Sequence, residues 1–290
     1  MKRLFKMAVL LCVLLLIIVG GSRIIVGNKL KKLDYHSKNI YVYERTKEKE
    51  LLSIKGDERV YPASLVKIMT TLVAIENIED FSEIAPVDVE TYKEMNSRNA
   101  SMAGFYGRER VSYKDLLYGT MLASGGEAAN SLAINISGST RDFVKLMNDK
   151  AKELELKNTA FVNPEGLDVE GQYSSAKDIA QILDYALENE NFREVFTSKT
   201  YTTTKTLDHP KGIALESTVL GKLDEYDQEG FEILGGKSGT TLEAGECWAT
   251  LSQKGEKEYI IVVMGSELEN IKDLHYYQVE DTLNILNNVK

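Results

Sequence analysis

The chain of 290 residues carries 35 basic and 44 acidic side chains, which gives a formal net charge of −9. Seven basic and no acidic residues precede Asp34, so the rest of the chain holds 28 basic and 44 acidic side chains, a net charge of −16. This acidity excludes a nucleic-acid-binding domain, because the phosphate backbone requires a basic surface. It suits a soluble domain exported from the cytoplasm.

The amino-terminal segment has the pattern of a membrane-targeting sequence. Residues 1–6 include three basic side chains, and residues 7–21 are uncharged and almost entirely aliphatic. A run that is apolar on every face predicts a secretory signal or an uncleaved anchor, and we favour the anchor. We expect 1–32 to form a cytoplasmic tail, a membrane anchor or signal segment and a short linker. We expect 33–290 to form one domain outside the cell membrane, or a secreted domain if the signal is cleaved.

Cysteine and histidine usage argues against a disulfide framework and a metal centre. Cys12 lies within the apolar run and Cys247 is alone in the rest of the chain, so no intramolecular disulfide is expected. His36, His209 and His275 lie far apart and show no ligand spacing. We predict no metal and no cofactor.

Hydrophobic periodicity predicts an α+β domain with strands at both ends and helices between them. The expected strands cover 39–43, 50–54, 231–234, 247–252 and 259–264, the last almost fully apolar and therefore central. The expected helices cover 64–78, 113–122, 128–136, 140–156, 174–189 and 279–289. Such an order predicts an antiparallel sheet built from both ends of the domain, flanked by helices, with a helical lobe and a cleft between the two.

The most informative motif is the Ser-x-x-Lys spacing of Ser64 and Lys67. Pro62 favours a helix start, and on a helix two residues three apart share a face, so the two side chains come within reach of each other. Ser174 and Lys177 have the same spacing, but there a serine at 174 or 175 is better explained as a helix cap, with Asp178 in the first turn.

Two downstream motifs strengthen the interpretation of Ser64. Ser124 is followed by Gly125 and Gly126, and residues 235–240 read Gly-Gly-Lys-Ser-Gly-Thr. Taken alone, the segment at Ser124 would be a turn after a helix, and residues 235–240 would be a glycine-rich turn. Residues 235–240 are not a P-loop, because that motif requires a glycine at position 231, where this chain has Phe231. Ser-x-x-Lys, then Ser-x-(Asn), then Lys-Thr/Ser-Gly, in that order, is the motif set of penicillin-recognising serine enzymes.

These residue types support acyl transfer. Ser64 is the expected nucleophile and Lys67 its base, provided that burial or the charge of Lys237 keeps the lysine neutral. Ser124 is expected to pass the proton to the leaving amine.

The third motif is expected to bind substrate. A turn at Gly239 and Thr240 is expected to present a backbone N–H opposite that of Ser64, forming an oxyanion hole. Lys237, Ser238 and Thr240 supply donors for a substrate carboxylate. The glycines at 235, 236 and 239 are expected to let the substrate backbone approach closely.

With these motifs the sequence resembles the D-alanyl-D-alanine carboxypeptidases, the low-molecular-mass penicillin-binding proteins. The similarity covers roughly residues 34–266 and is densest in 62–70, 122–130, 161–168 and 173–178. The resemblance implies a penicillin-recognising, β-lactamase-like serine hydrolase fold, with 33–290 as the catalytic D,D-peptidase domain. It implies removal of the terminal D-Ala from peptidoglycan stem peptides through an acyl-Ser64 intermediate, and inhibition by β-lactams. In the family's pattern Ser64 is the nucleophile, Lys67 the base, Ser124 the proton shuttle and Lys237 the carboxylate binder.

The chain departs from this pattern at two places. The second motif of the family ends in Asn, which binds the substrate amide, and here Gly126 stands in its place, with Glu127 or Asn130 as candidate substitutes. The family often carries a β-rich second domain and a carboxy-terminal anchor, whereas this sequence stops at Lys290, soon after the expected catalytic domain, so the amino-terminal span is expected to do the anchoring.

Two alternative functions remain open. A β-lactamase requires a carboxylate that activates the deacylating water, and Glu165 lies in a suggestive loop, although 163–168 fits the carboxypeptidase pattern better. A catalytically impaired wall-binding or penicillin-binding protein is the other alternative, and it rests on Gly126.

Overall fold

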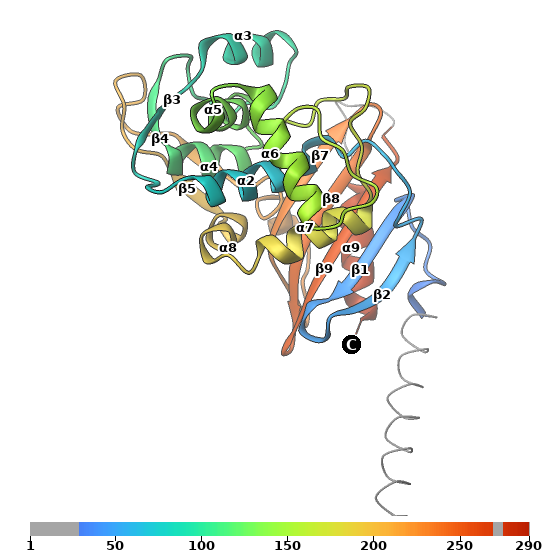
Figure 1. Cartoon of the computed structure of the whole chain (residues 1–290). Helices are drawn as coiled ribbons and strands as arrows, with labels where there is room; N and C mark the ends of the chain where they lie inside the picture. Colours follow the sequence, from blue (N-terminus) through green and yellow to red (C-terminus); the bar gives the residue numbers. More distant parts are fainter. Residues whose placement is uncertain (1–28, 269–274, 290) are drawn as a thin grey trace, which may run out of the picture.

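The computed structural model describes residues 29–268 and 275–289, and an antiparallel sheet of five strands organises them (Figure 1). The strand order is β2-β1-β9-β8-β7, so strands from both ends of the domain pair in one sheet, as the sequence predicts. The strands are β1 (Asn39–Glu44), β2 (Lys49–Ile54), β7 (Glu232–Thr241), β8 (Gly245–Lys254) and β9 (Lys257–Ser266). The apolar strand predicted to be central is β9, at the middle of the sheet.

Alternating side chains give the sheet two apolar faces. Along β9, Ile260 and Val262 belong to the cluster shared with the helical lobe, whereas Ile261 and Val263 belong to a second cluster on the opposite face. Helix α7 (Ala176–Ala186) covers the first face and α9 (Tyr277–Asn288) the second. The sheet is therefore the middle layer between helices, in agreement with the prediction.

The helical lobe lies on one side of the sheet, and α2 runs through its centre (Figure 1). Its helices are α2 (Val66–Asn77), α3 (Val89–Ser97), α4 (Tyr113–Met121), α5 (Gly126–Ser137), α6 (Thr140–Glu153) and α8 (Glu190–Thr197). Two small two-stranded sheets join it, β3 (Ile84–Pro86) with β4 (Arg110–Ser112) and β5 (Thr200–Thr202) with β6 (Ala214–Glu216). Short 3₁₀ turns cover Arg45–Lys47, Ala63–Leu65 and Lys222–Glu225.

The sequence did not predict α3, α8 or the four short strands. Helix α3 is mostly polar and buries a single residue, Met95, so it carries almost no hydrophobic period. The predicted cap of α7 is confirmed, because Ser175 Oγ accepts a hydrogen bond from the Asp178 backbone N–H.

One local prediction was wrong. The turn expected at Gly239 and Thr240 is absent: residues 235–240, with their three glycines, lie inside β7, paired with β8 from Glu232 to Thr241. Cross-strand hydrogen bonds and a close neighbour on the other side hold these glycines extended, which outweighs their local preference for turns.

The predicted membrane segment lies outside the described residues. Within 29–268 and 275–289, none of the helices combines the length and the apolar character that a membrane span requires.

Candidate active site

Ser64 and Lys67 form a contact at the amino-terminal end of α2. Ser64 lies in the 3₁₀ turn Ala63–Leu65, which continues into the helix, so the two side chains lie on one side. Lys67 Nζ lies 3.0 Å from Ser64 Oγ, within hydrogen-bonding distance. Lys67 also donates a short hydrogen bond to the backbone carbonyl of Glu165. The geometry therefore suits proton transfer from the serine hydroxyl to the amine.

Burial changes the proton affinity of Lys67. The side chain is almost completely buried, and this burial lowers the pKa of Lys67 to about 8, although the carboxylates of Glu165 and Glu127 oppose the shift. A lysine with this pKa is neutral in a useful fraction of molecules near neutral pH. Burial, rather than the charge of Lys237, is the main cause of the shift.

Two glycines enclose the backbone of Ser64. A Cβ on Gly239 of β7 would lie 2.8 Å from the Ser64 nitrogen, and a Cβ on Gly166 would lie 2.2 Å from the Ala63 carbonyl oxygen. Ala63 itself has a φ of 47°, an unfavourable conformation for a residue with a side chain. The nucleophile is thus mounted on a strained backbone that β7 and the 163–168 loop hold from two sides.

Ser124 and Lys237 form a second contact from the other motifs. Lys237 Nζ donates to Ser124 Oγ at 2.9 Å and to the Ser238 carbonyl at 2.7 Å. Lys237 is fully buried, and burial together with the charge of Lys67 lowers its pKa well below the usual value. Ser124 has a φ of 60°, so this serine also stands on a backbone in the left-handed region. The structure therefore brings all three sequence motifs together.

The remaining residues of the third motif differ in what they contact. Ser238 Oγ lies 2.7 Å from Thr218 Oγ1 at an exposed position, and Thr240 lines the pocket that contains Ser64. The glycine prediction was partly wrong: the missing Cβ of Gly235 faces Phe196, and that of Gly236 faces Val219. At these two glycines other segments of the domain, not the substrate backbone, pack directly on the strand.

A pocket of about 500 Å³ opens in front of Ser64 and Lys67. Its walls come from the turn after α3, the first residue of α5, the 163–168 loop and the end of β7. The lining residues are Ser64, Lys67, Arg98, Asn99, Ala100, Ser101, Gly126, Glu165, Gly166, Leu167, Asp168, Thr240, Thr241 and Leu242. Arg98, Asn99 and Asp168 were not predicted as pocket residues, because none of them belongs to the three catalytic motifs and only the fold brings them to the pocket.

Another hollow, of about 440 Å³, lies elsewhere in the helical lobe. Tyr118 and Tyr201 stack in its wall, and it contains no residue of the three motifs. The described residues include no group of three or more His, Cys, Asp or Glu side chains that could hold a metal ion. Of these two hollows, the pocket at Ser64 is the one that combines a nucleophile with a base.

Gly126 is packed by the protein itself. A Cβ at this position would lie 2.9 Å from Met95 Sδ, and its backbone N–H donates to the Ser101 carbonyl at 2.7 Å. Helix α3 and the turn after it therefore occupy the space next to residue 126. An asparagine side chain there would require Met95 to move.

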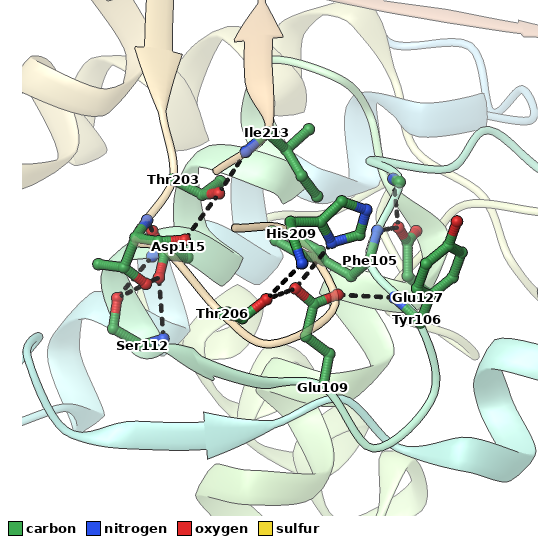
Figure 2. A network of polar contacts seen from close by, with 12 residues as sticks. Phe105, Tyr106, Glu109, Ser112, Asp115, Glu127, Thr203, Thr206, His209 and Ile213 are labelled. Atoms are coloured by element: carbon green, nitrogen blue, oxygen red, sulfur yellow. Dashed lines mark hydrogen bonds and ion pairs between the residues drawn. The ribbon is translucent and has the colours of Figure 1, made fainter. Parts of the chain in front are cut away.

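Neither candidate substitute for the family's asparagine lines the pocket. Glu127 is fully buried and points toward the 103–105 segment, where its Oε1 accepts backbone hydrogen bonds from Ala103, Gly104 and Phe105 at 2.7, 3.0 and 3.3 Å (Figure 2). Burial raises the pKa of this carboxyl. Asn130 is also buried, one turn further along α5. Glu127 thus ties the second motif to the segment that follows the pocket wall.

Comparison with known proteins agrees with this geometry. Residues 27–267 match the family model described as D-alanyl-D-alanine carboxypeptidase. The chain belongs to this family. DacF of Bacillus subtilis, a D-alanyl-D-alanine carboxypeptidase, is 36% identical over 240 residues, which cover 83% of this chain and 60% of DacF. DacC of Escherichia coli is 31% identical over 77% of this chain and 55% of its own length.

Solved structures of related proteins show the same fold. The crystal structure of the Streptomyces K15 DD-transpeptidase superposes with a TM-score of 0.78 at 29% identity, covering 89% of this chain and 98% of that protein. Penicillin-binding protein 5 of Haemophilus influenzae superposes with a TM-score of 0.73 at 26% identity, covering 87% and 69% of the two chains. The α+β, penicillin-recognising fold predicted from the sequence is therefore confirmed. The chain spans somewhat more than half the length of the curated relatives DacF and DacC.

Proposed function

We propose that this protein is a serine D-Ala-D-Ala carboxypeptidase that removes the terminal D-Ala from peptidoglycan stem peptides through an acyl-Ser64 intermediate. The observation that carries the proposal is the buried Lys67 amine, 3.0 Å from Ser64 Oγ and with a pKa lowered to about 8. The family membership of residues 27–267 supports the same reaction.

In acylation, neutral Lys67 takes the hydroxyl proton of Ser64 while Oγ attacks the carbonyl carbon of the penultimate D-Ala. The C–N bond then breaks, and the departing D-Ala amine needs a proton. Ser124, whose Oγ lies 2.9 Å from Lys237 Nζ, delivers it, and the proton that Lys67 took from Ser64 then restores the Ser124 hydroxyl. The Ser64–Lys67 pair therefore acts at the attacked carbonyl carbon, and the Ser124–Lys237 pair acts at the leaving amine.

Strand β7 supplies the binding groups. It is an edge strand of the five-stranded sheet, and an edge strand offers unpaired backbone groups to an extended peptide. The backbone N–H groups of Ser64 and Thr240 form the oxyanion hole, since β7 packs directly on the Ser64 turn at Gly239. Lys237, Ser238 and Thr240 attract the terminal carboxylate of the substrate.

The location follows from the substrate. Stem peptides lie outside the cytoplasmic membrane, so we place the catalytic domain there. The apolar run at 7–21 would serve as anchor or signal.

The test is release of D-Ala from a pentapeptide ending in D-Ala-D-Ala, with Ser64→Ala as the matched variant. We expect release from the wild type and none above background from Ser64→Ala. The same pair is incubated with a fluorescent penicillin, and only the wild type should become labelled. A folded wild type that neither releases D-Ala nor takes the label would move the assignment to a wall-binding protein.

A further inference from the structure

The pocket contains one buried carboxyl that the acylation step does not use. Glu165 is 5% exposed and lines the pocket together with Ser64 and Lys67. Burying a carboxyl group away from water costs free energy, and such groups in a cleft gather at functional sites. A buried carboxyl in the pocket that contains the nucleophile therefore calls for a chemical explanation.

The backbone around Glu165 is fixed to α2 and to its own loop. Lys67 donates to the Glu165 carbonyl, and Thr70 Oγ1 donates to the Pro164 carbonyl at 2.7 Å. The next residue, Gly166, donates its N–H to Asn163 Oδ1 at 2.7 Å. The backbone that carries the carboxyl is therefore fixed within the wall of the pocket that contains Ser64.

The surroundings of the carboxyl favour proton uptake. Burial raises the pKa of Glu165, while the positive charges of Lys67 and Arg98 pull it down and Glu94 adds to the rise. Its own backbone N–H is the one hydrogen-bond donor that acts on the carboxyl within the part of the chain that the structure describes. Its oxygens are thus available to accept a hydrogen bond from water.

We propose that Glu165 is a further catalytic residue, whose carboxylate binds and deprotonates the water that hydrolyses acyl-Ser64. This inference rests on the proposed function, and it extends the activity to slow hydrolysis of β-lactams bound to the same serine. The water oxygen bonds to the acyl carbon and gives one proton to Glu165. The ester bond from carbon to Ser64 Oγ breaks. Glu165 passes the proton that it took from water to Lys67. Lys67 Nζ, 3.0 Å from Ser64 Oγ, then gives a proton to Oγ. The acyl group leaves as a carboxylic acid.

A purely electrostatic role is the competing explanation. In that case Glu165 would only support the charge on Lys67, and its loss would change the rate of acylation. The general-base role predicts the opposite division: loss of the carboxylate does not slow acylation, and it slows deacylation.

The experiment measures both steps in the full chain with a fluorescent penicillin. Acylation is followed as the rate of labelling, and deacylation as the rate at which label is lost after excess probe is removed. The variants are Glu165→Gln, which keeps the shape, and Glu165→Asp, which keeps the acid. The matched control is Glu170→Gln, which removes an exposed charge from the same region of chain.

We expect Glu165→Gln to label no more slowly than the wild type, because loss of its charge lowers the Lys67 pKa further, and to lose label about 10²–10⁴-fold more slowly, the range typical of a lost general base. Glu165→Asp should lose label at a rate between those of the wild type and Glu165→Gln, and Glu170→Gln should lose label at the wild-type rate. Wild-type rates of label loss in Glu165→Gln, or a slower labelling with unchanged loss, would overturn the inference and leave the proposed function intact. A wild type that never labels would overturn both. Normal labelling itself shows that a variant is folded.

Discussion

Gly239 of β7 and Ser64 of the α2 turn touch backbone to backbone: a Cβ on the glycine would lie 2.8 Å from the serine nitrogen. This contact joins the sheet to the helical lobe at the point where the nucleophile stands. It also brings the next residue of β7, Thr240, to the pocket that contains Ser64. The position of the nucleophile is therefore determined by two segments that lie far apart in the sequence.

We expect Gly239→Ala to abolish labelling by penicillin, because the new methyl group pushes β7 away from Ser64. Overpacking of this kind costs about 1–3 kcal/mol of stability. The control is Gly255→Ala, at a hairpin position with open space, where only the positive φ of 62° is penalised. The checks are urea unfolding and the labelling rate. Full labelling of Gly239→Ala would contradict the steric argument.

The pH dependence of acylation should report Lys67. Because its pKa is lowered to about 8, the amine loses its proton as the pH rises through that value. The labelling rate should rise about tenfold per pH unit below 8 and level off above it. Lys67→Arg, which stays charged, should lower the rate about 10²–10⁴-fold at every pH. A rate that falls between pH 6 and 8 would count against a lysine base.

Gly126→Asn tests why the family's asparagine is absent. The side chain would meet Met95 Sδ at 2.9 Å, so we expect a loss of about 1–3 kcal/mol in the free energy of unfolding. Adding Met95→Ala removes the clash, and the double variant should be more stable than the sum of the two single changes predicts. The measurement is a double-mutant cycle by urea unfolding. Additive effects would show that Met95 does not occupy the space.

Glu127 should contribute stability through the three amides whose hydrogen bonds it accepts (Figure 2). Glu127→Ala leaves those N–H groups without an acceptor, at a cost of about 1–3 kcal/mol for each that stays buried. Glu127→Gln is the matched control: it retains a carbonyl acceptor, and Oε2, which it replaces, has no hydrogen-bond partner among the described residues. Thermal unfolding of the two variants compares them. Equal stability losses would indicate that the charge, not the hydrogen bonds, matters.

A second network in the same region joins the β5–β6 hairpin loop to the lobe (Figure 2). Glu109 Oε1 lies 2.8 Å from His209 Nδ1 and accepts a hydrogen bond from Thr206 Oγ1 at 2.6 Å. Asp115 accepts a hydrogen bond from the Thr204 backbone N–H at 2.9 Å. These contacts hold the loop with side chains from segments far away along the chain. No sequence pattern predicted these contacts, because hydrogen bonds between residues far apart along the chain leave no periodic pattern in the sequence.

Most of the fold could be read along the chain: the strands of the five-stranded sheet, the helices other than α3 and α8, the family, and the four side chains of the two serine–lysine pairs. Hydrophobic period and short motifs are local properties, which is why the sequence was sufficient for them. Three-dimensional packing was needed to show that Gly239 and Thr240 lie in a strand rather than a turn and that Met95 fills the space beside Gly126. It was also needed to show that Glu127 points away from the pocket while Glu165 lines it. Each of these features depends on which distant segment packs against the residue, and packing partners are set by the whole fold.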